Sequence, residues 1–102
     1  MAAKILVIDN DAETLEVIRL VLDFEGFDVI ATMESDDVPG LVRIHQPDLL
    51  LIDYLLNGID GSEICAVLKN AFETASLPIV IMSAYPKGIQ SKAAQNADAF
   101  IA

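Results

Sequence analysis

The sequence is poor in cysteine and in basic residues, and it lacks tryptophan altogether. Its single cysteine, Cys65, cannot form a disulfide within the chain, and its apolar neighbours at helical spacing predict a buried free thiol without a catalytic role. The six lysines and arginines are scattered singly among 16 acidic residues, which gives a formal net charge of −10. Because binding to DNA or RNA phosphates needs a basic patch, direct nucleic-acid binding is not expected.

Long apolar runs are also missing, although 54% of the 102 residues are hydrophobic. No run approaches the roughly 18 residues that a membrane-spanning helix needs. The apolar run at the N-terminus stops at Asp9, which is too early for a secretory signal. The length suits one small domain with a single core. We therefore expect a cytoplasmic protein that does not contact a membrane.

Short β-rich runs alternate with longer stretches whose apolar residues lie three or four positions apart. This alternation predicts an α/β fold with a parallel sheet covered by helices on both faces. Within the run 48–52, the four residues after Asp48 are all apolar, as expected for a central strand of such a sheet. The expected strands are 4–8, 27–31, 48–52, 78–82 and 98–101, and the expected helices are 12–25, 36–45, 62–74 and 88–95.

Capping residues and apolar faces can be assigned to three of these helices. Asp11 is expected to cap the first helix and Gly26 to end it, and Ser35 is expected to cap the second, which Pro39 and Gly40 should keep short or irregular. The apolar spacing predicts inward faces made of Leu15, Ile18, Val21 and Leu22 on the first helix and of Ile64, Cys65, Leu68 and Phe72 on the third.

Polar side chains gather where the predicted strands end: Asp9, Asn10 and Asp11 after the first, Asp53 after the third and Ser83 after the fourth. In open α/β sheets the functional residues lie at the carboxyl ends of the strands. If the first and third strands are neighbours, their terminal carboxylates share one pocket, where mutual repulsion favours a hard divalent cation. Mg²⁺ suits such a site, because it takes one or two carboxylates and completes its shell with waters and phosphate oxygens.

Four stretches together resemble one known family, the receiver domains of two-component response regulators of the CheY-like superfamily. They are "KILVIDND" (4–11), "PDLLLIDYLLNGIDG" (47–61), "LPIVIMSA" (77–84) and "NADAFIA" (96–102), and they extend over nearly the whole chain. The resemblance implies a flavodoxin-like doubly wound fold with a five-stranded parallel sheet in the order 2-1-3-4-5 and about four helices.

The resemblance also implies roles for individual residues. Asp53 would accept a phosphoryl group from a histidine kinase or a phosphotransfer protein, and Ser83 would be the hydroxyl that senses it. Phe100 would be the switch aromatic. Mg²⁺ would be held by Asp9, Asn10, Asp53 and the backbone carbonyl of Leu55. Such a receiver is not an enzyme in the usual sense, because it catalyses only its own phosphorylation and dephosphorylation.

The sequence departs from the family pattern at three places. Asn10 replaces an acid that normally ligates Mg²⁺, so metal affinity should be weaker. Asn57 stands where proline is usual, which should loosen the loop after Asp53. The sequence stops at Ala102, before the position of the family's lysine and fifth helix. We therefore expect a single receiver domain over 1–102 that is incomplete at its C-terminus, and a possible homodimer or segment exchange to cover the sheet face that the fifth helix would share with the first.

Two alternatives remain open at this point. A pseudo-receiver would use the same fold as a phosphorylation-independent interaction module, and Asn10 together with the missing lysine favours it. A haloacid-dehalogenase-like phosphatase would use Asp9 as nucleophile and Asp11 as acid/base, but it leaves Asp53 without a role. Neither the partner kinase nor the downstream output can be predicted from these residues.

Overall fold

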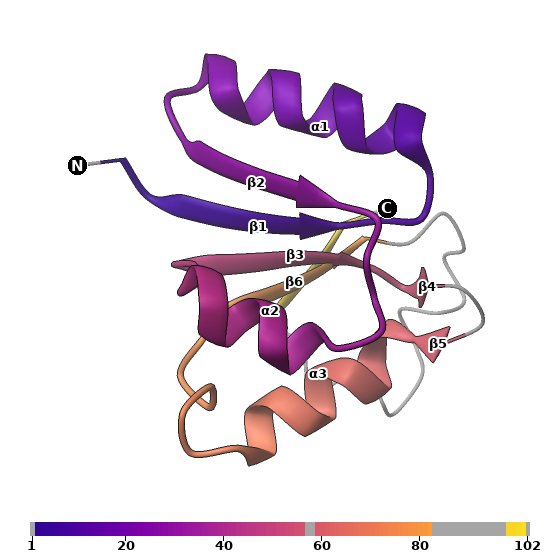
Figure 1. Ribbon diagram of the computed structural model, residues 1–102, viewed down its shortest axis with the longest axis vertical. Coiled ribbons are helices and arrows are strands. Elements are labelled where there is room, and N and C mark those ends of the chain that lie inside the picture. The colour runs from indigo at the N-terminus through magenta and orange to yellow at the C-terminus, as the bar shows by residue number, and fades with distance from the viewer. Residues whose placement is uncertain (1, 57–58, 83–97, 102) are drawn as a thin grey trace.

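The computed structural model describes residues 2–56, 59–82 and 98–101, and its elements follow the predicted alternation (Figure 1). A parallel five-stranded sheet has the order β2-β1-β3-β6-β7, with a separate antiparallel pair, β4-β5. The predicted order 2-1-3-4-5 is confirmed. The elements are β1 (Lys4–Ile8), α1 (Ala12–Phe24), β2 (Asp28–Thr32), α2 (Val38–His45), β3 (Leu49–Asp53), β4 (Leu55–Leu56), β5 (Ile59–Asp60), α3 (Gly61–Asn70), β6 (Ile79–Met82) and β7 (Ala99–Ile101).

The sheet is covered on both faces, by α1 on one and by α2 and α3 on the other (Figure 1). Alternate residues of a strand point to opposite faces. On β1, Leu6 and Ile8 therefore pack with α2 and α3, whereas Ile5 and Val7 pack with α1. The central strand β3 divides in the same way and supplies apolar residues to both clusters. This double burial explains why the strand is apolar from Leu49 to Ile52.

Helix α1 begins and ends as the sequence predicts. The Asp11 side chain accepts a hydrogen bond from the Glu13 N–H, and Gly26 adopts φ = +94° just beyond the helix. Leu15 is buried, and Ile18 and Leu22 pack against the sheet. The prediction for Val21 is wrong, because its side chain is 57% exposed. It lies on the flank of α1 with Val17, Leu20 and Phe24, beside the packing face and not within it.

Helix α2 begins later than predicted, at Val38, and Asp37 caps it in place of Ser35. The Asp37 side chain accepts a hydrogen bond of 3.0 Å from the Gly40 N–H, and Pro39 fits the first turn because no intrahelical donor is needed there. A Cβ atom at residue 40 would collide with the Asp37 carboxylate, so any larger residue there would displace this carboxylate from its capping position. The Pro-Gly pair therefore belongs to the helix start and does not disrupt the helix.

Helix α3 ends at Asn70, four residues earlier than predicted, and residues 72–76 form turns. The Thr74 hydroxyl and the Ala71 N–H both donate to the Leu68 carbonyl. The carbonyls in the last turn of a helix have no intrahelical donor, and these two bonds supply donors to Leu68 where the helix stops. Ile64, Cys65 and Leu68 pack into the core as predicted. Phe72 does not, because its side chain is 99% exposed.

The remaining predictions fall in three groups. Cys65 is a buried free thiol, as expected, and burial raises its pKa to about 11. The hairpin β4-β5 was not expected from the sequence, and the helix expected at 88–95 lies outside the described residues. Among the residues that the structure describes, no helix combines the length and apolar character needed to cross a bilayer.

One polar contact ties α3 to the last strand. The Lys69 ammonium donates to the Asp98 carboxylate at 2.7 Å and to the Leu77 carbonyl at 2.8 Å, and Asp98 also accepts from the Ile79 N–H at 2.8 Å. These contacts, with Lys69 the stronger, lower the pKa of Asp98 below its ordinary value. The contact therefore joins the end of α3 to the starts of β6 and β7.

We expect Asp98→Asn to lower the free energy of unfolding by about 0.5 to 1 kcal/mol at neutral pH, because the Asp98 side chain is half exposed and the pair is partly screened. A lowered folded-state pKa contributes stability above the unfolded-state pKa of about 3.9, and this contribution disappears as the pH falls through the folded-state value. Urea unfolding at pH 7 and near pH 3 tests this. A difference between the two proteins that is as large in acid as at pH 7 would contradict it.

Candidate functional site

The strand register brings two of the predicted carboxylates to one edge of the sheet. Ile8 of β1 is the partner of Ile52 of β3, and Asp9 and Asp53 come next on the two strands. Neighbouring strands lie about 4.8 Å apart, so the two backbones leave the sheet side by side. On the other side of β3, Asp53 is the partner of Met82, and the Tyr54 N–H donates to the Met82 carbonyl at 2.7 Å. The carboxyl ends of β1, β3 and β6 therefore meet around Asp53.

Asp9 is held firmly at this edge. Its side chain is buried, and one carboxylate oxygen accepts a hydrogen bond of 2.9 Å from the Asp11 N–H two residues later. Its own N–H donates to the Thr32 carbonyl at the end of β2. Asp53 is half buried. The structure thus places a buried, oriented carboxylate on the strand beside the predicted phosphoacceptor.

The two residues after Asp9 differ in their surroundings. The Asn10 side chain is exposed to solvent. Asp11 turns to the start of α1, where its carboxylate accepts from the Thr14 hydroxyl at 2.8 Å and from the Glu13 N–H at 3.1 Å. These hydrogen bonds, with Thr14 the stronger, lower the pKa of Asp11. Asp11 is therefore a helix cap, as predicted, and both of its carboxylate oxygens are engaged away from Asp53.

The donor set predicted for Mg²⁺ is small. In residues 2–56, 59–82 and 98–101 there is no group of three or more His, Cys, Asp or Glu side chains that could hold a metal ion. The predicted set contains only two carboxylates, Asp9 and Asp53, with the Asn10 amide and the Leu55 carbonyl as the remaining oxygens. Mg²⁺ needs only one or two carboxylates and keeps several waters. The chemistry of this donor set fits Mg²⁺ with fewer formal charges than a three-acid site.

The other predicted residues are located less fully. Leu55 begins the hairpin β4-β5, two residues after Asp53, and the pairing of Leu55 with Asp60 folds this loop back toward the start of α3. Phe100 lies on β7 opposite Ile81 of β6, so its backbone is two strands away from Asp53. Ser83 lies outside the described residues. The hairpin could not be predicted from the sequence, because strands of two residues show no periodicity.

Comparison with known proteins agrees with this architecture. A family model described as the response regulator receiver domain matches residues 5–102. The chain is similar to the response regulator TrrA from Thermotoga maritima, solved in complex with Mg²⁺ and BeF, with 21% identity, a TM-score of 0.89 and coverage of 99% of this chain and 85% of that one.

Two further structures resemble the chain to a similar degree. A putative response regulator from Chloroflexus aurantiacus gives 24% identity and a TM-score of 0.88, with 98% of this chain and 84% of that one covered. The BeF3-activated N-terminal receiver domain of RstA from Klebsiella pneumoniae gives 25% identity and a TM-score of 0.80, with 96% and 83% covered. The sheet order, the carboxylates at the ends of β1 and β3 and the family match agree, and the chain belongs to the response regulator receiver domain family of two-component systems.

Proposed function

We propose that this receiver domain accepts a phosphoryl group on Asp53 from a phosphohistidine of a histidine kinase or a phosphotransfer protein. The observation that carries the proposal is the placement of Asp53 at the end of β3, directly beside the buried carboxylate of Asp9 at the end of β1. A strand tip exposes the Asp53 carboxylate to a partner while the sheet holds it in place. The measurement that tests the proposal is phosphoryl uptake in the presence and absence of Asp53.

The transfer can be written with this chain's own residues. A carboxylate oxygen of Asp53 attacks the phosphorus atom, the bond from phosphorus to the imidazole nitrogen breaks, and an acyl phosphate forms as the imidazole leaves. Asp9, Asn10, Asp53 and the Leu55 carbonyl would hold Mg²⁺, which when bound offsets charge on the transferred oxygens. The hydrogen bond from the Asp11 N–H holds the Asp9 carboxylate at its position beside Asp53.

Ser83 and Phe100 complete the proposal as a switch. Ser83 is the next residue in the sequence after Met82, which pairs with Asp53, and we expect its hydroxyl to sense the phosphoryl group. Phe100 is on the adjacent strand β7. Binding of the Ser83 hydroxyl to a phosphoryl oxygen would shift the population toward a state in which Phe100 turns inward. We expect backbone NMR shifts at both residues to change when beryllofluoride and Mg²⁺ are added. Unchanged shifts at both would contradict the switch.

A pseudo-receiver that functions without phosphorylation is the second candidate, and the neutral Asn10 amide in place of an acid favours it. The two candidates differ in one observable, the uptake of a phosphoryl group by Asp53. The family assignment gives no support to a haloacid-dehalogenase-like phosphatase, and the engagement of Asp11 as a helix cap leaves that alternative without its acid/base.

Asn10→Asp should tighten Mg²⁺ binding by about tenfold or more. The substitution adds a full negative charge beside Asp9 and Asp53, and two unit charges about 4 Å apart attract by about 1 kcal/mol in water and about 4 kcal/mol at an effective dielectric constant of 20. The measurement is the Mg²⁺ midpoint for phosphorylation by phosphoramidate, with intact mass as the readout.

Asp36→Asn is a suitable charge control, because Asp36 is an exposed acidic residue outside the candidate site. It should leave the Mg²⁺ midpoint unchanged. If Asn10→Asp also leaves the midpoint unchanged, residue 10 does not contact the metal and the predicted donor set is wrong.

A further inference from the structure

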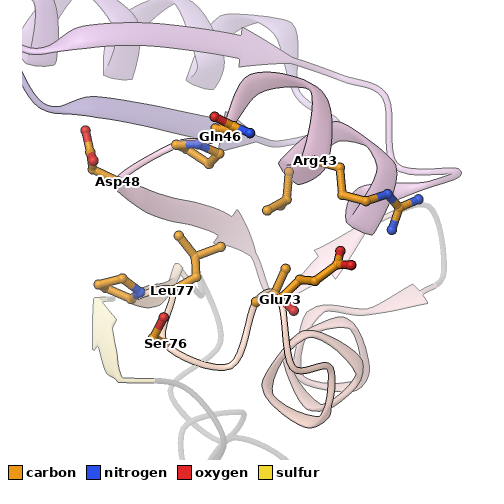
Figure 2. A pocket seen from close by; sticks show the side chains of 10 residues that line it. Arg43, Gln46, Asp48, Glu73, Ser76 and Leu77 are labelled. Atoms are coloured by element: carbon orange, nitrogen blue, oxygen red, sulfur yellow. The ribbon is translucent and has the colours of Figure 1, made fainter.

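A cavity of about 650 Å³ lies at the edge of the sheet where β3 and β6 begin, away from the ends that carry Asp9 and Asp53 (Figure 2). Its walls come from the C-terminal end of α2, the start of β3 and the loop between α3 and β6. Four lining residues are buried, namely Val42, Pro47, Thr74 and Leu77. The Thr74 hydroxyl already donates to the Leu68 carbonyl. The buried part of the lining is therefore mainly apolar.

The rim of the cavity has the opposite character. Arg43, Gln46, Asp48, Glu73 and Ser76 are all exposed, and Figure 2 shows Arg43 and Glu73 on one side of the opening. Neither Arg43 nor Glu73 forms an ion pair with another described residue. An apolar floor inside a polar rim is the usual anatomy of a protein interface. The cavity therefore suits an apolar side chain of a partner surface that also carries acidic and basic residues around that side chain.

Phe72 supplies such a side chain on the same edge. It directly precedes Glu73 and Thr74 of the cavity wall, and 99% of its side chain is exposed. Burying this ring against another molecule would remove a large apolar surface from water, which favours association. A protruding ring beside an apolar cavity is self-complementary under twofold symmetry, because the ring of each copy can enter the cavity of the other.

The local charge also favours a second copy. The chain as a whole has six basic and 16 acidic residues, so most surfaces of two copies repel each other. Near the cavity, the Lys4 backbone N–H donates to Asp48, the Lys4 ammonium donates to the His45 carbonyl, and Lys69 pairs with Asp98, whereas Arg43 and Glu73 form no ion pair within the described part of the chain. Three basic and three acidic residues therefore lie near this edge, so repulsion between two copies should be weaker here than the net charge of −10 implies.

We propose that the chain forms a weak twofold dimer in which Phe72 of each copy enters the cavity of the other, and Arg43 of one copy pairs with Glu73 of the second. This interface is independent of the site around Asp53. It leaves the carboxyl ends of the strands open to a phosphoryl donor. It also differs from the association expected from the sequence, which would cover the sheet face shared with the first helix, because the cavity lies on the opposite side, with α2 and α3.

Sedimentation equilibrium of the whole chain, from micromolar to millimolar concentration, tests the proposal. Phe72→Ala should raise the dissociation constant roughly a hundredfold, because each dimer loses two buried rings worth about tenfold apiece. Phe24→Ala is the matched control, since Phe24 is 89% exposed on α1. It should change nothing.

Charge exchange provides a second test that does not depend on Phe72. Arg43→Glu and Glu73→Arg should each weaken the dimer, and the double variant should restore it. A chain that stays monomeric at every concentration overturns the proposal. So does association that is lost in Phe24→Ala and kept in Phe72→Ala, because the flank of α1 would then be the interface.

Discussion

Asp53→Asn should abolish the uptake of a phosphoryl group from phosphoramidate or acetyl phosphate in the presence of Mg²⁺, whereas the unchanged chain should gain the mass of one phosphoryl group. The asparagine amide keeps the shape of the side chain but is a poor nucleophile, because its nitrogen lone pair is delocalised and its oxygen carries no full charge. Asp53 is half buried at the end of a central strand, so the substitution should leave the fold intact. Intact mass spectrometry is the measurement.

The two aspartates near the end of β1 provide graded controls. Asp9→Asn should lower the extent of labelling at limiting Mg²⁺, because it removes one of the two carboxylates of the donor set. Asp11→Asn should leave labelling nearly unchanged, because both Asp11 oxygens are engaged at the start of α1. Labelling that survives in Asp53→Asn and disappears in Asp9→Asn would show that Asp9, and not Asp53, is the nucleophile.

Leu68→Ala should lower the free energy of unfolding by about 3 kcal/mol, within a usual range of about 2 to 5 kcal/mol for such changes. Leu68 is 1% exposed and packs among Cys65, Ile79 and Ile81, so truncation removes contacts and leaves a cavity that the strands cannot fill. For a small domain this is a large share of the total stability. Urea unfolding followed by circular dichroism gives the value.

Val67, the residue of α3 that precedes Leu68, provides a control for this substitution. Val67 is 58% exposed, so Val67→Ala should change the free energy of unfolding by no more than about 0.5 kcal/mol, with alanine's better helix propensity offsetting any lost contact. Equal losses in the two variants would show that α3 packs through a different face from the one described.

The strands, and the position of Asp9 and Asp53 at the carboxyl ends of two of them, could be predicted because they depend on short stretches of sequence. Each main strand lies within about one residue of its prediction, since a run of β-branched and aliphatic residues bounded by polar ones carries its own limits. The meeting of Asp9 and Asp53 followed from a general rule on strand ends and from the pairing of β1 with β3. The caps by Asp11 and Gly26 depend on neighbouring residues only, and both are confirmed.

The errors arise where tertiary contacts compete with periodicity. The apolar spacing of α3 continues through Phe72, but the Thr74 hydroxyl and the Ala71 N–H take the Leu68 carbonyl, and the helix ends at Asn70. At α2 the choice between Ser35 and Asp37 as cap depends on the room that Gly40 leaves for a carboxylate. Nothing in the sequence alone ranks such alternatives. The exposed ring of Phe72, which periodicity assigned to the core, is the feature that led to the proposed dimer.

The most direct test of the account is to locate the phosphoryl group on the unchanged chain. After incubation with phosphoramidate and Mg²⁺, borohydride reduction converts an aspartyl phosphate to homoserine, and peptide mass mapping identifies the reduced residue. We expect reduction at Asp53 alone, and only when Mg²⁺ is present. Reduction at Asp9 or Asp11, or a chain that takes up no phosphoryl group at any Mg²⁺ concentration although it is folded, would contradict it.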